Sequence, residues 1–391
     1  MINVEEAFKI LSQNVGANAS VNMDLNAALG YVLAEDVKSL IDMPSFDQSA
    51  MDGYAFNFQE DINDYKVVGE VAAGSSDNPQ LKIGEGVRIF TGAMVPNDAN
   101  IVVQQEWIDR NENMATITQE VKVGRNIRLK GEQIQQGDIA LEKGTLITPA
   151  GVGFLTGLGI AEVSVVQKPK ISLITTGNEL VKVGNGLEPG QIYESNSTML
   201  AAAFEQYDFK NYSMTTVVDN YEATKENIHE AIQNSDVVIL TGGISVGDYD
   251  FVGKALQELN VEQLFYKINQ KPGKPIYMGK KGDTIIAGLP GNPAAALSCF
   301  YMYVLPTLHL IVGKCFQGLE KVALPLGEDY TKKGSRAEFL KARIKDGQLF
   351  VLNMQSSAML RSFATADALV YIPASTTNVA KMEKVDAYRL R

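Results

Sequence analysis

The fold is decided by the stretch Val237-Val238-Ile239-Leu240-Thr241-Gly242-Gly243-Ile244-Ser245-Val246-Gly247-Asp248-Tyr249-Asp250-Phe251. Its first four residues form a short, β-branched apolar run that is typical of a buried strand, and a helical pattern over Phe251–Leu259 follows the glycines. Glycines let backbone N–H groups approach an oxyanion, a helix N-terminus adds partial positive charge, and aspartates can hold a divalent cation against that anion. The stretch therefore predicts a phosphate-binding turn. On its own it is also compatible with a plain capped helix after a tight turn.

Strand and helix patterns alternate on both sides of this stretch. After Pro169, a strand over Ile171–Ile174 ends in Thr175-Thr176-Gly177-Asn178-Glu179, and a helix is predicted over Thr198–Gln206. The alternation continues to a helix that begins at Asn292-Pro293. It predicts a doubly wound, mostly parallel sheet, whose ligand lies at the carboxyl ends of the strands. Every glycine-rich motif of this region follows a predicted strand, so we expect all of them to meet in one crevice.

Two further motifs in this region favour an anionic ligand. Lys271-Pro272-Gly273-Lys274-Pro275 carries two ammonium groups on a proline-stiffened loop, although a solvated basic turn is the alternative. Gly288-Leu289-Pro290-Gly291-Asn292-Pro293 predicts Asn292 as the N-cap and Pro293 as the first residue of a long, buried helix. A structural helix start would also explain this second motif by itself.

Three carboxylates are expected beside these loops. Glu179, Asp219 and Asp250 all follow predicted strands and therefore stand at the same edge of the sheet. Without a cation they would repel one another and any anionic ligand, so the arrangement predicts a bridging Mg²⁺ ion.

The flanking regions predict other domains. Residues 1–38 have two apolar faces near helical spacing, Val4 to Leu11 and Leu25 to Val32, and a helix is expected again around Thr148–Leu158. Strand-like segments fill residues 65–123 and recur from about residue 316. We therefore predict a discontinuous helical domain (1–40 and 126–168), an inserted β domain (41–125), an αβ domain (169–315) and a C-terminal β barrel or sandwich (316–391).

Two sites within the predicted β domain are ambiguous. Taken by itself, the Asp52-Gly53 dipeptide predicts a hairpin turn. Thr91-Gly92-Ala93 follows a strand, so Thr91 could donate its hydroxyl and N–H groups to an anion, while a plain β-turn explains the segment equally well.

Composition excludes several classes of function. The net charge of −11 argues against a general nucleic-acid surface. The N-terminus shows no basic region followed by an apolar core, and no run approaches membrane-spanning length, so we expect a cytoplasmic protein. The two cysteines, Cys299 and Cys315, are expected as buried thiols, and two isolated histidines make a His-based metal centre or a Ser/His/Asp triad untenable.

Seven motifs in order make the chain resemble the MoeA family, the molybdopterin molybdenumtransferases, which includes the E domain of gephyrin. The resemblance spans essentially the whole chain. It rests on Ser49-Ala50-Met51-Asp52-Gly53-Tyr54-Ala55, Arg88-Ile89-Phe90-Thr91-Gly92-Ala93, Thr176-Gly177-Asn178-Glu179-Leu180, Gly190-Gln191-Ile192-Tyr193, Gly242 to Asp250, Lys271 to Pro275 and Gly288 to Pro293.

The resemblance implies a reaction and an assembly. Adenylylated molybdopterin and molybdate would give molybdenum cofactor and AMP with the help of Mg²⁺. The protein would be a homodimer in which the β domain of one subunit reaches the site of the other. The molybdopterin adenylyltransferase and the recipient molybdoenzymes would be further partners, with no role for nucleic acid or membranes. Adenylyl transfer to molybdopterin and a non-catalytic scaffold are the alternatives.

The resemblance also implies roles for individual residues. Asp52, Glu179, Asp250, Lys271 and Lys274 would be catalytic, and Glu179 and Asp250 would bind the metal ion. Ser356 and Ser357 could face the site from the C-terminal domain. Two departures from the family pattern are Gln133, where the family often has Asp, and Gln48, where Asn is common. Ligand-binding roles fall on Thr91, Arg128, Thr176, Gly177, Asp219, Gly242, Gly243, Ser245, Gly247, Pro290, Gly291 and Asn292.

Overall fold

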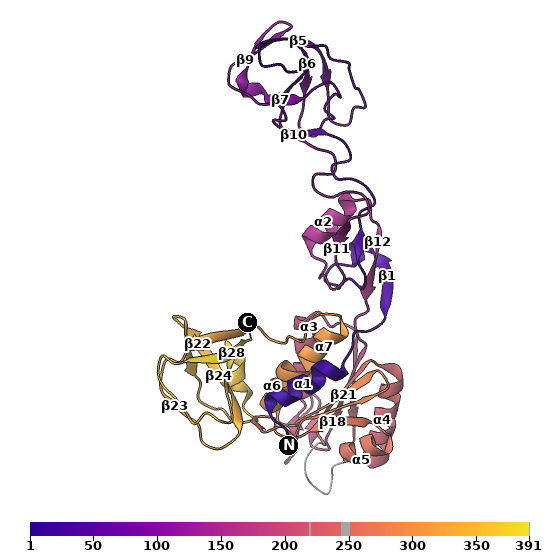
Figure 1. Cartoon of the computed structure of the whole chain (residues 1–391). Helices are drawn as coiled ribbons and strands as arrows, with labels where there is room; N and C mark the ends of the chain where they lie inside the picture. The colour runs from indigo at the N-terminus through magenta and orange to yellow at the C-terminus, as the bar shows by residue number, and fades with distance from the viewer. Residues whose placement is uncertain (219, 244–250, 391) are drawn as a thin grey trace. The chain divides into compact units, whose positions relative to one another are not determined.

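The computed structural model describes residues 1–218, 220–243 and 251–390 (Figure 1). The chain divides into two compact units. The first combines Met1–Val21 with Val166–Arg391, and the second is Asn22–Val165.

A six-stranded sheet forms the centre of the first unit. Its strands follow the order β16 (Tyr212–Val217), β13 (Ile171–Thr176), β17 (Val237–Thr241), β21 (Thr284–Leu289), β20 (Tyr277–Lys281) and β18 (Glu262–Tyr266). The first four strands are parallel, and β20 runs antiparallel to both β21 and β18. The prediction of a mostly parallel sheet is confirmed.

Helices cover both faces of this sheet because successive strand residues point to opposite sides. Ile171 and Leu173 of β13 pack in one cluster with α1 (Val4–Asn14), α3 (Asn196–Gln206) and α6 (Pro293–Cys299). Ile174 packs in a second cluster with α4 (Tyr221–Asn234) and α5 (Phe251–Glu258). The doubly wound arrangement is therefore confirmed, and α1 belongs to this core.

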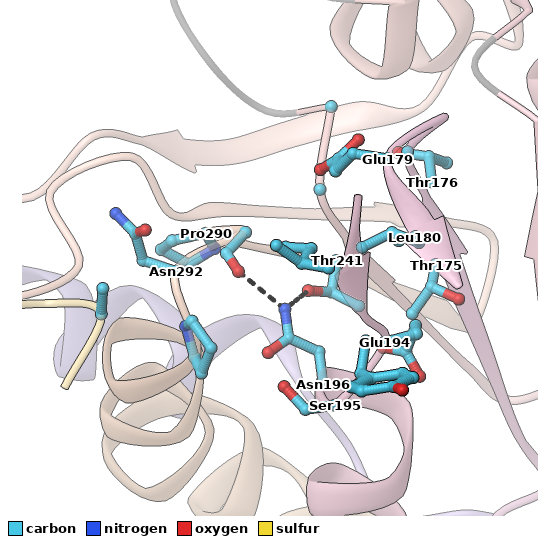
Figure 2. Close-up of a pocket in the computed structure, with 18 of the residues that line it drawn as sticks. Thr175, Thr176, Glu179, Leu180, Glu194, Ser195, Asn196, Thr241, Pro290 and Asn292 are labelled. Atoms are coloured by element: carbon cyan, nitrogen blue, oxygen red, sulfur yellow. Dashed lines mark hydrogen bonds between the residues drawn. The ribbon is translucent and has the colours of Figure 1, made fainter. Parts of the chain in front are cut away.

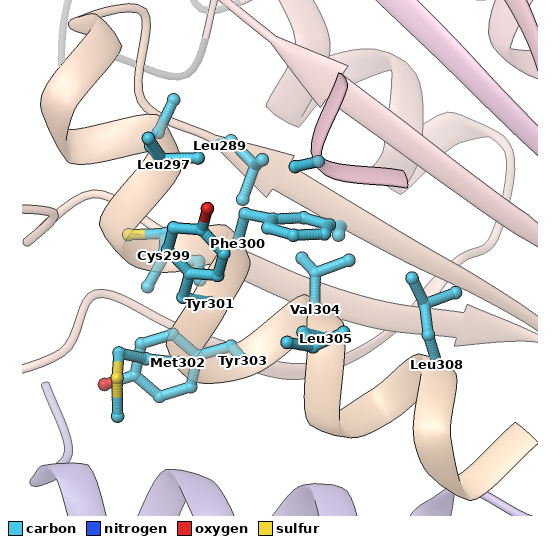
Figure 3. Packing of buried hydrophobic residues seen from close by; sticks show 14 of the residues in the cluster. Leu289, Leu297, Cys299, Phe300, Tyr301, Met302, Tyr303, Val304, Leu305 and Leu308 are labelled. Carbon is cyan, nitrogen blue, oxygen red and sulfur yellow. The ribbon is translucent and has the colours of Figure 1, made fainter. Parts of the chain in front are cut away.

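The predicted buried helix continues through a π-helical turn, Phe300–Val304, into α7 (Leu305–Ile311). Its apolar side chains pack into the large cluster, as Figure 3 shows. The whole helix, Pro293–Ile311, has 19 residues and a mean hydropathy of 1.5, so the expectation that no run reaches membrane-spanning length was wrong. However, 89% of its 18-residue apolar window is buried inside the protein, where it packs in the large core cluster. Cys299 is buried as predicted, whereas Cys315 is exposed, and both thiols are free.

A second six-stranded sheet forms the C-terminal β domain. Its strands follow the order β19 (Gln270–Lys271), β24 (Ala337–Lys345), β26 (Ala368–Ile372), β28 (Lys384–Arg389) and β22 (Lys321–Pro325), with β25 (Gln348–Val351) paired to β24. A bridge between Leu326 and Leu349 closes the sheet, which confirms the predicted barrel. Two short strands, β23 (Tyr330–Thr331) and β27 (Asn378–Val379), and helix α8 (Leu360–Ala364) complete the domain. Because β19 lies in the Lys271–Pro275 loop segment, this loop is attached to the barrel.

The second unit contains the predicted β domain. Its sheet follows the order β7 (Ile101–Gln104), β4 (Gly53–Phe56), β6 (Glu85–Ile89), β5 (Asp64–Val71), β9 (Met114–Ile117) and β8 (Ile108–Asn111). The strand pair β3 (Gln48–Ser49) with β10 (Ile127–Arg128) also belongs to this unit. The strand pair β2 (Val37–Lys38) with β11 (Ile139–Leu141) and helix α2 (Pro149–Gly157) pack in a separate small core (Figure 1). The remaining short elements are β1 (Ser20–Asp24), which pairs with β12 (Glu162–Val166), the 3₁₀ turns Leu25–Ala27 and Gln105–Trp107, and, in the first unit, the pair β14 (Leu180–Val181) with β15 (Ile192–Tyr193).

The predicted helix around Leu25–Val32 was wrong. Only a 3₁₀ turn forms at Leu25–Ala27, where the Asp24 carboxylate accepts the N–H of Asn26. Gly30 then adopts a φ of +79°, which a continuing helix does not allow. Residues 126–168 likewise hold one helix among short strands, so the expected helical domain is of mixed structure. The finer division into four domains stays a prediction.

Candidate active site

A cavity of about 640 Å³ opens at the carboxyl ends of β13, β17 and β21 (Figure 2). Thr176, Gly242 and Pro290 line it directly at or after these strand ends. The connection that leaves β13 runs to β16 on one side of it, whereas the connection that leaves β17 runs toward β18 at the other edge of the sheet. Ligand crevices in open αβ sheets form at such topological switch points. The convergence predicted from the glycine motifs is therefore confirmed for the described residues.

Two glycines let the end of β17 approach the end of β13. Gly242 and Gly243 have φ values of +89° and +64°, a region that side-chain-bearing residues rarely adopt. A Cβ atom on Gly242 would lie 2.4 Å from the carbonyl oxygen of Thr176. The backbone of the turn can thus lie against Thr176 only without a side chain, which leaves its polar groups at the cavity wall.

The start of α6 forms the wall at the end of β21. Asn292 occupies the N-cap position as predicted, but its side chain caps no backbone group of the helix. Instead, its Nδ2 atom donates to Ser357 Oγ at 3.1 Å, and the Ser357 carbonyl accepts the N–H of Ala295 at 3.1 Å. The loop that carries Ser357 also places Ala358 in the cavity lining. Ser357 thus contacts a lining residue without being part of the lining itself, and its role in the site stays a prediction.

Asn196, at the start of α3, is a site residue that the motif analysis missed. Its Nδ2 atom donates to Thr241 Oγ1 at 2.9 Å and to the Gly291 carbonyl at 2.8 Å, so it ties two strand ends together. Asn196 Oδ1 and Thr176 Oγ1 are buried and have no hydrogen-bond partner among the described residues. Both atoms belong to residues that line the cavity, where a ligand could satisfy them. Its only sequence signal is its place three residues after the Gly190–Tyr193 motif, and it belongs to no glycine-rich turn.

Two glutamates line the cavity and differ in their partners. Glu194 accepts the N–H of Ser197 at 2.9 Å and also its hydroxyl group, so it serves the start of α3. Glu179 is exposed and forms no side-chain hydrogen bond or ion pair that the described residues show. No cluster of three or more His, Cys, Asp or Glu side chains suited to a metal ion occurs within residues 1–218, 220–243 and 251–390.

Four of the predicted residues lie outside the described residues. They are Asp219, Ser245, Gly247 and Asp250. The second predicted metal ligand is among them, and so is most of the glycine-rich turn that opens the sequence analysis.

The two predicted lysines differ in their surroundings. Lys274 is exposed and precedes Pro275, which lines the cavity. Lys271 is not part of the lining, and its Nζ lies 3.3 Å from Oε1 of the buried Glu338. The loop therefore reaches the cavity at its Pro275 end and is fixed to the barrel at its Lys271 end.

Within the second unit, Asp52 and Thr91 form a pair. The N–H and the hydroxyl of Thr91 donate to Asp52 Oδ1 at 2.7 and 2.8 Å. These two bonds, the backbone one first, lower the pKa of Asp52 below its ordinary value. The anion that Thr91 binds in this structure is thus Asp52. The local hairpin reading of Asp52-Gly53 was wrong, because Gly53 begins β4, which pairs with β6 and β7.

Arg128 lies elsewhere in the second unit. It is exposed on β10, where it stands opposite Gln48 of β3. The structure thus brings Asp52 and Thr91 into contact, whereas Arg128 lies on strand β10.

Comparison with known proteins identifies the family. Residues 2–159 match the MoeA N-terminal region (domains I and II), residues 172–310 a probable molybdopterin-binding domain, and residues 323–390 the MoeA C-terminal region (domain IV). A molybdopterin molybdenumtransferase of Staphylococcus epidermidis is 32% identical over 389 residues, which covers 96% of this chain and 92% of the relative. The chain belongs to the MoeA family.

Other relatives in the MoeA family agree. A molybdopterin molybdenumtransferase of Staphylococcus aureus is 30% identical over 98% of this chain and 94% of its own length. The crystal structure of a molybdopterin biosynthesis MoeA protein from Pyrococcus horikoshii superposes with a TM-score of 0.84, at 29% identity and full coverage of both chains. The fold derived above is therefore that of a MoeA protein, as the seven motifs predicted.

Proposed function

We propose that this chain is a molybdopterin molybdenumtransferase of molybdenum cofactor biosynthesis. Its substrates would be adenylylated molybdopterin and molybdate, and its products molybdenum cofactor and AMP. The observation that carries the proposal is the cavity at the switch point of the αβ sheet, in a chain that matches MoeA proteins along its length. In the reaction, the two dithiolene thiols of the pterin would replace two oxo groups of molybdate, which would leave as water, while a water molecule would cleave the phosphoanhydride and release AMP.

The cavity suits an anionic, hydrogen-bonding ligand. The backbone N–H groups of Gly242 and Gly243 and the hydroxyl of Thr176 belong to lining residues and would donate hydrogen bonds to an anion. Lys274 adds a positive charge beside Pro275 in a protein of net charge −11. The unpartnered Oδ1 of Asn196 would accept a hydrogen bond from a pterin N–H group. These groups would bind and orient the substrate before bond cleavage.

We also propose Mg²⁺ as the cofactor, held by Glu179 together with Asp250. When bound, the ion would neutralise the negative charge that the pyrophosphate and molybdate bring to the site. Glu179 supports this proposal as an exposed carboxylate in the lining without another partner among the described residues.

The test is a turnover assay with purified protein, adenylylated molybdopterin, molybdate and Mg²⁺. We expect AMP release that requires molybdate. Consumption of ATP with molybdopterin would instead indicate an adenylyltransferase. Binding of adenylylated molybdopterin without any AMP release would indicate a scaffold.

A cytoplasmic homodimer is the assembly that we propose. Asp52, Thr91 and Arg128 of one subunit would complete the site of the other. Mixing two impaired variants, Asp52→Asn and Glu179→Gln, at a Mg²⁺ concentration too low for either variant to turn over alone tests this arrangement. In a mixed dimer one of the two sites keeps both residues, so activity should return. Light scattering that finds only monomers, or mixing without any recovery, would reject the shared site.

A further inference from the structure

A buried lysine in the C-terminal barrel has no role in the site described above. Lys341 on β24 is only 1% exposed and is one of the largest fully buried side chains. No ion pair involves it in the part of the chain that the structure describes. Burial of an ammonium group without a carboxylate costs several kcal/mol unless hydrogen bonds compensate it. A charge in this position therefore needs an explanation other than stability.

The ammonium group of Lys341 donates only to backbone carbonyls of one loop. Its Nζ atom lies 3.1 Å from the oxygen of Met354, 3.4 Å from that of Ser356 and 3.4 Å from that of Met359. Three carbonyls match the three donors of an ammonium group. This loop, residues 352–359, connects β25 to α8.

The backbone of Lys341 holds the same loop. Gln355 accepts the N–H of Lys341 at 3.0 Å and donates to its carbonyl at 2.8 Å. The carbonyl of Lys341 also accepts the N–H of Leu352 at 2.9 Å. One residue of the barrel thus fixes both ends and the middle of the loop.

The far side of the loop is a wall of the cavity. Ser357 accepts from Asn292 Nδ2 at 3.1 Å and from the Ala295 N–H at 3.1 Å, and Ala358 lines the cavity. The chain of contacts runs from Lys341 through the loop to the start of α6. We propose that Lys341 is a positioning residue of this site, which holds the 352–359 loop so that Ser357 bonds to Asn292 and Ala358 completes the cavity wall. The proposal rests on the proposed function for its substrate.

The three carbonyls keep other donors when the ammonium group is removed. Ser362 Oγ donates to the carbonyl oxygens of Met354 and Met359, at 2.7 and 3.3 Å. The N–H of Met359 donates to the carbonyl oxygen of Ser356 at 3.2 Å. The single hydroxyl proton of Ser362 is shared between the Met354 and Met359 oxygens, so a Lys341→Met variant leaves each carbonyl at least a shared donor. Replacing a buried charge with an apolar side chain of similar volume is often neutral or stabilising. The expected effect is a looser loop in a protein that still folds.

The experiment compares Lys341→Met with Lys341→Arg and Lys332→Met. Lys332 is the matched control, because it is 4% exposed and donates to the carbonyls of Pro373 and Ala374, which do not line the cavity. Hydrogen exchange of the full-length proteins is followed in peptides that cover residues 352–360 and 292–297, together with the thermal midpoint. The KM for adenylylated molybdopterin and kcat are measured on the same samples.

For Lys341→Met we expect at least tenfold faster exchange in both peptides, an unchanged or higher thermal midpoint, and a tenfold higher KM with kcat within twofold. Lys341→Arg should restore most of the protection, and Lys332→Met should leave both peptides and KM unchanged. Exchange within twofold of the wild type, or a lower midpoint with uniformly faster exchange, would overturn the positioning role. A loosened loop with an unchanged KM would overturn it as well. If the wild type shows no turnover, the proposed function fails while the exchange result still decides whether Lys341 holds the cavity wall.

Discussion

Glu338 and Lys271 face each other across the pair of strands that joins the two sheets of the first unit. They are direct partners in the β19–β24 register, and Lys271 Nζ lies 3.3 Å from Glu338 Oε1. The other Glu338 oxygen accepts from the Tyr330 hydroxyl at 2.6 Å, so both oxygens of this buried carboxylate are used. The lysine predicted to bind an anionic ligand therefore already has an anion, supplied by the barrel.

The Lys271–Glu338 pair should contribute more to stability than a surface pair. A double-mutant cycle with Lys271→Gln and Glu338→Gln should give a coupling energy of about 1 kcal/mol in chemical denaturation, because Glu338 is buried while Lys271 is half exposed. The control cycle uses Lys321 and Asp386, which lie 2.8 Å apart but are both largely exposed. It should give less than about 0.5 kcal/mol. Equal coupling in the two cycles would contradict this ranking.

The charge of Lys341 predicts a dependence of stability on pH. Burial lowers its pKa from 10.5 to about 8. Between these values the unfolded chain binds a proton that the folded chain does not, so the free energy of unfolding rises with pH across this range. Measured as the difference between the wild type and Lys341→Met, the contribution of this lysine should increase by roughly 1–3 kcal/mol between pH 7 and 10. A flat difference would show that the lysine keeps its proton throughout.

The Glu179 carboxylate should affect metal dependence and leave folding intact. Because it is exposed and unpaired among the described residues, Glu179→Gln should keep the thermal midpoint while raising the Mg²⁺ concentration for half-maximal AMP release at least tenfold. Glu194→Gln is the contrasting variant. Its carboxylate bonds to Ser197 at the start of α3, so it should lower stability by about 1 kcal/mol. Loss of stability in Glu179→Gln would indicate a structural role instead.

Gly242 should not tolerate a side chain. In Gly242→Ala the new Cβ would meet the Thr176 carbonyl oxygen at 2.4 Å, and the φ of +89° adds strain. We expect a loss of roughly 2–4 kcal/mol in the free energy of unfolding, together with loss of ligand binding. Gly190→Ala isolates the strain, since Gly190 has a φ of +88° and no atom within 4 Å of the added Cβ. It should lose only about 1 kcal/mol. Similar losses in the two variants would show that the close approach to Thr176 adds no destabilisation beyond the backbone strain.

The hydroxyl of Thr91 should help to keep the pKa of Asp52 low. Thr91→Val removes one of the two hydrogen bonds that lower the pKa of Asp52, so the pKa should rise part of the way toward its ordinary value. The stability that this carboxylate contributes is present at neutral pH and is lost as the pH falls through its folded pKa, so the loss would then begin at a higher pH. Carbon-13 NMR titration of the carboxyl groups measures the shift. Thr118→Val, whose hydroxyl bonds to the Trp107 carbonyl, should leave Asp52 unchanged.

Several elements were predictable because their signals are local. The β17 run and the glycines after it specify a strand and a turn by chain geometry alone, and alternation of such units implies a parallel sheet with its crevice at the strand ends. The helix expected at Leu25–Val32 failed because its apolar spacing also fits a sequence of turns packed on a small core. Periodicity reports burial, and here a cap at Asp24 and the positive φ of Gly30 decided the backbone.

The amino-acid sequence by itself determined the doubly wound sheet, the convergence of its glycine turns and the membership of the family, because each depends on short-range pattern and order along the chain. Only the tertiary structure decided that Lys271 pairs with Glu338, that Asn196 ties β17 to β21, and that Lys341 holds the loop at the cavity wall. Lys271 and Glu338 lie 67 residues apart in the chain, and Asn196 lies 45 and 95 residues from its partners Thr241 and Gly291. Lys341 lies 13 residues from Met354. Which of many lysines, asparagines and carbonyls meet is set by the packing of whole elements, and no local pattern records it.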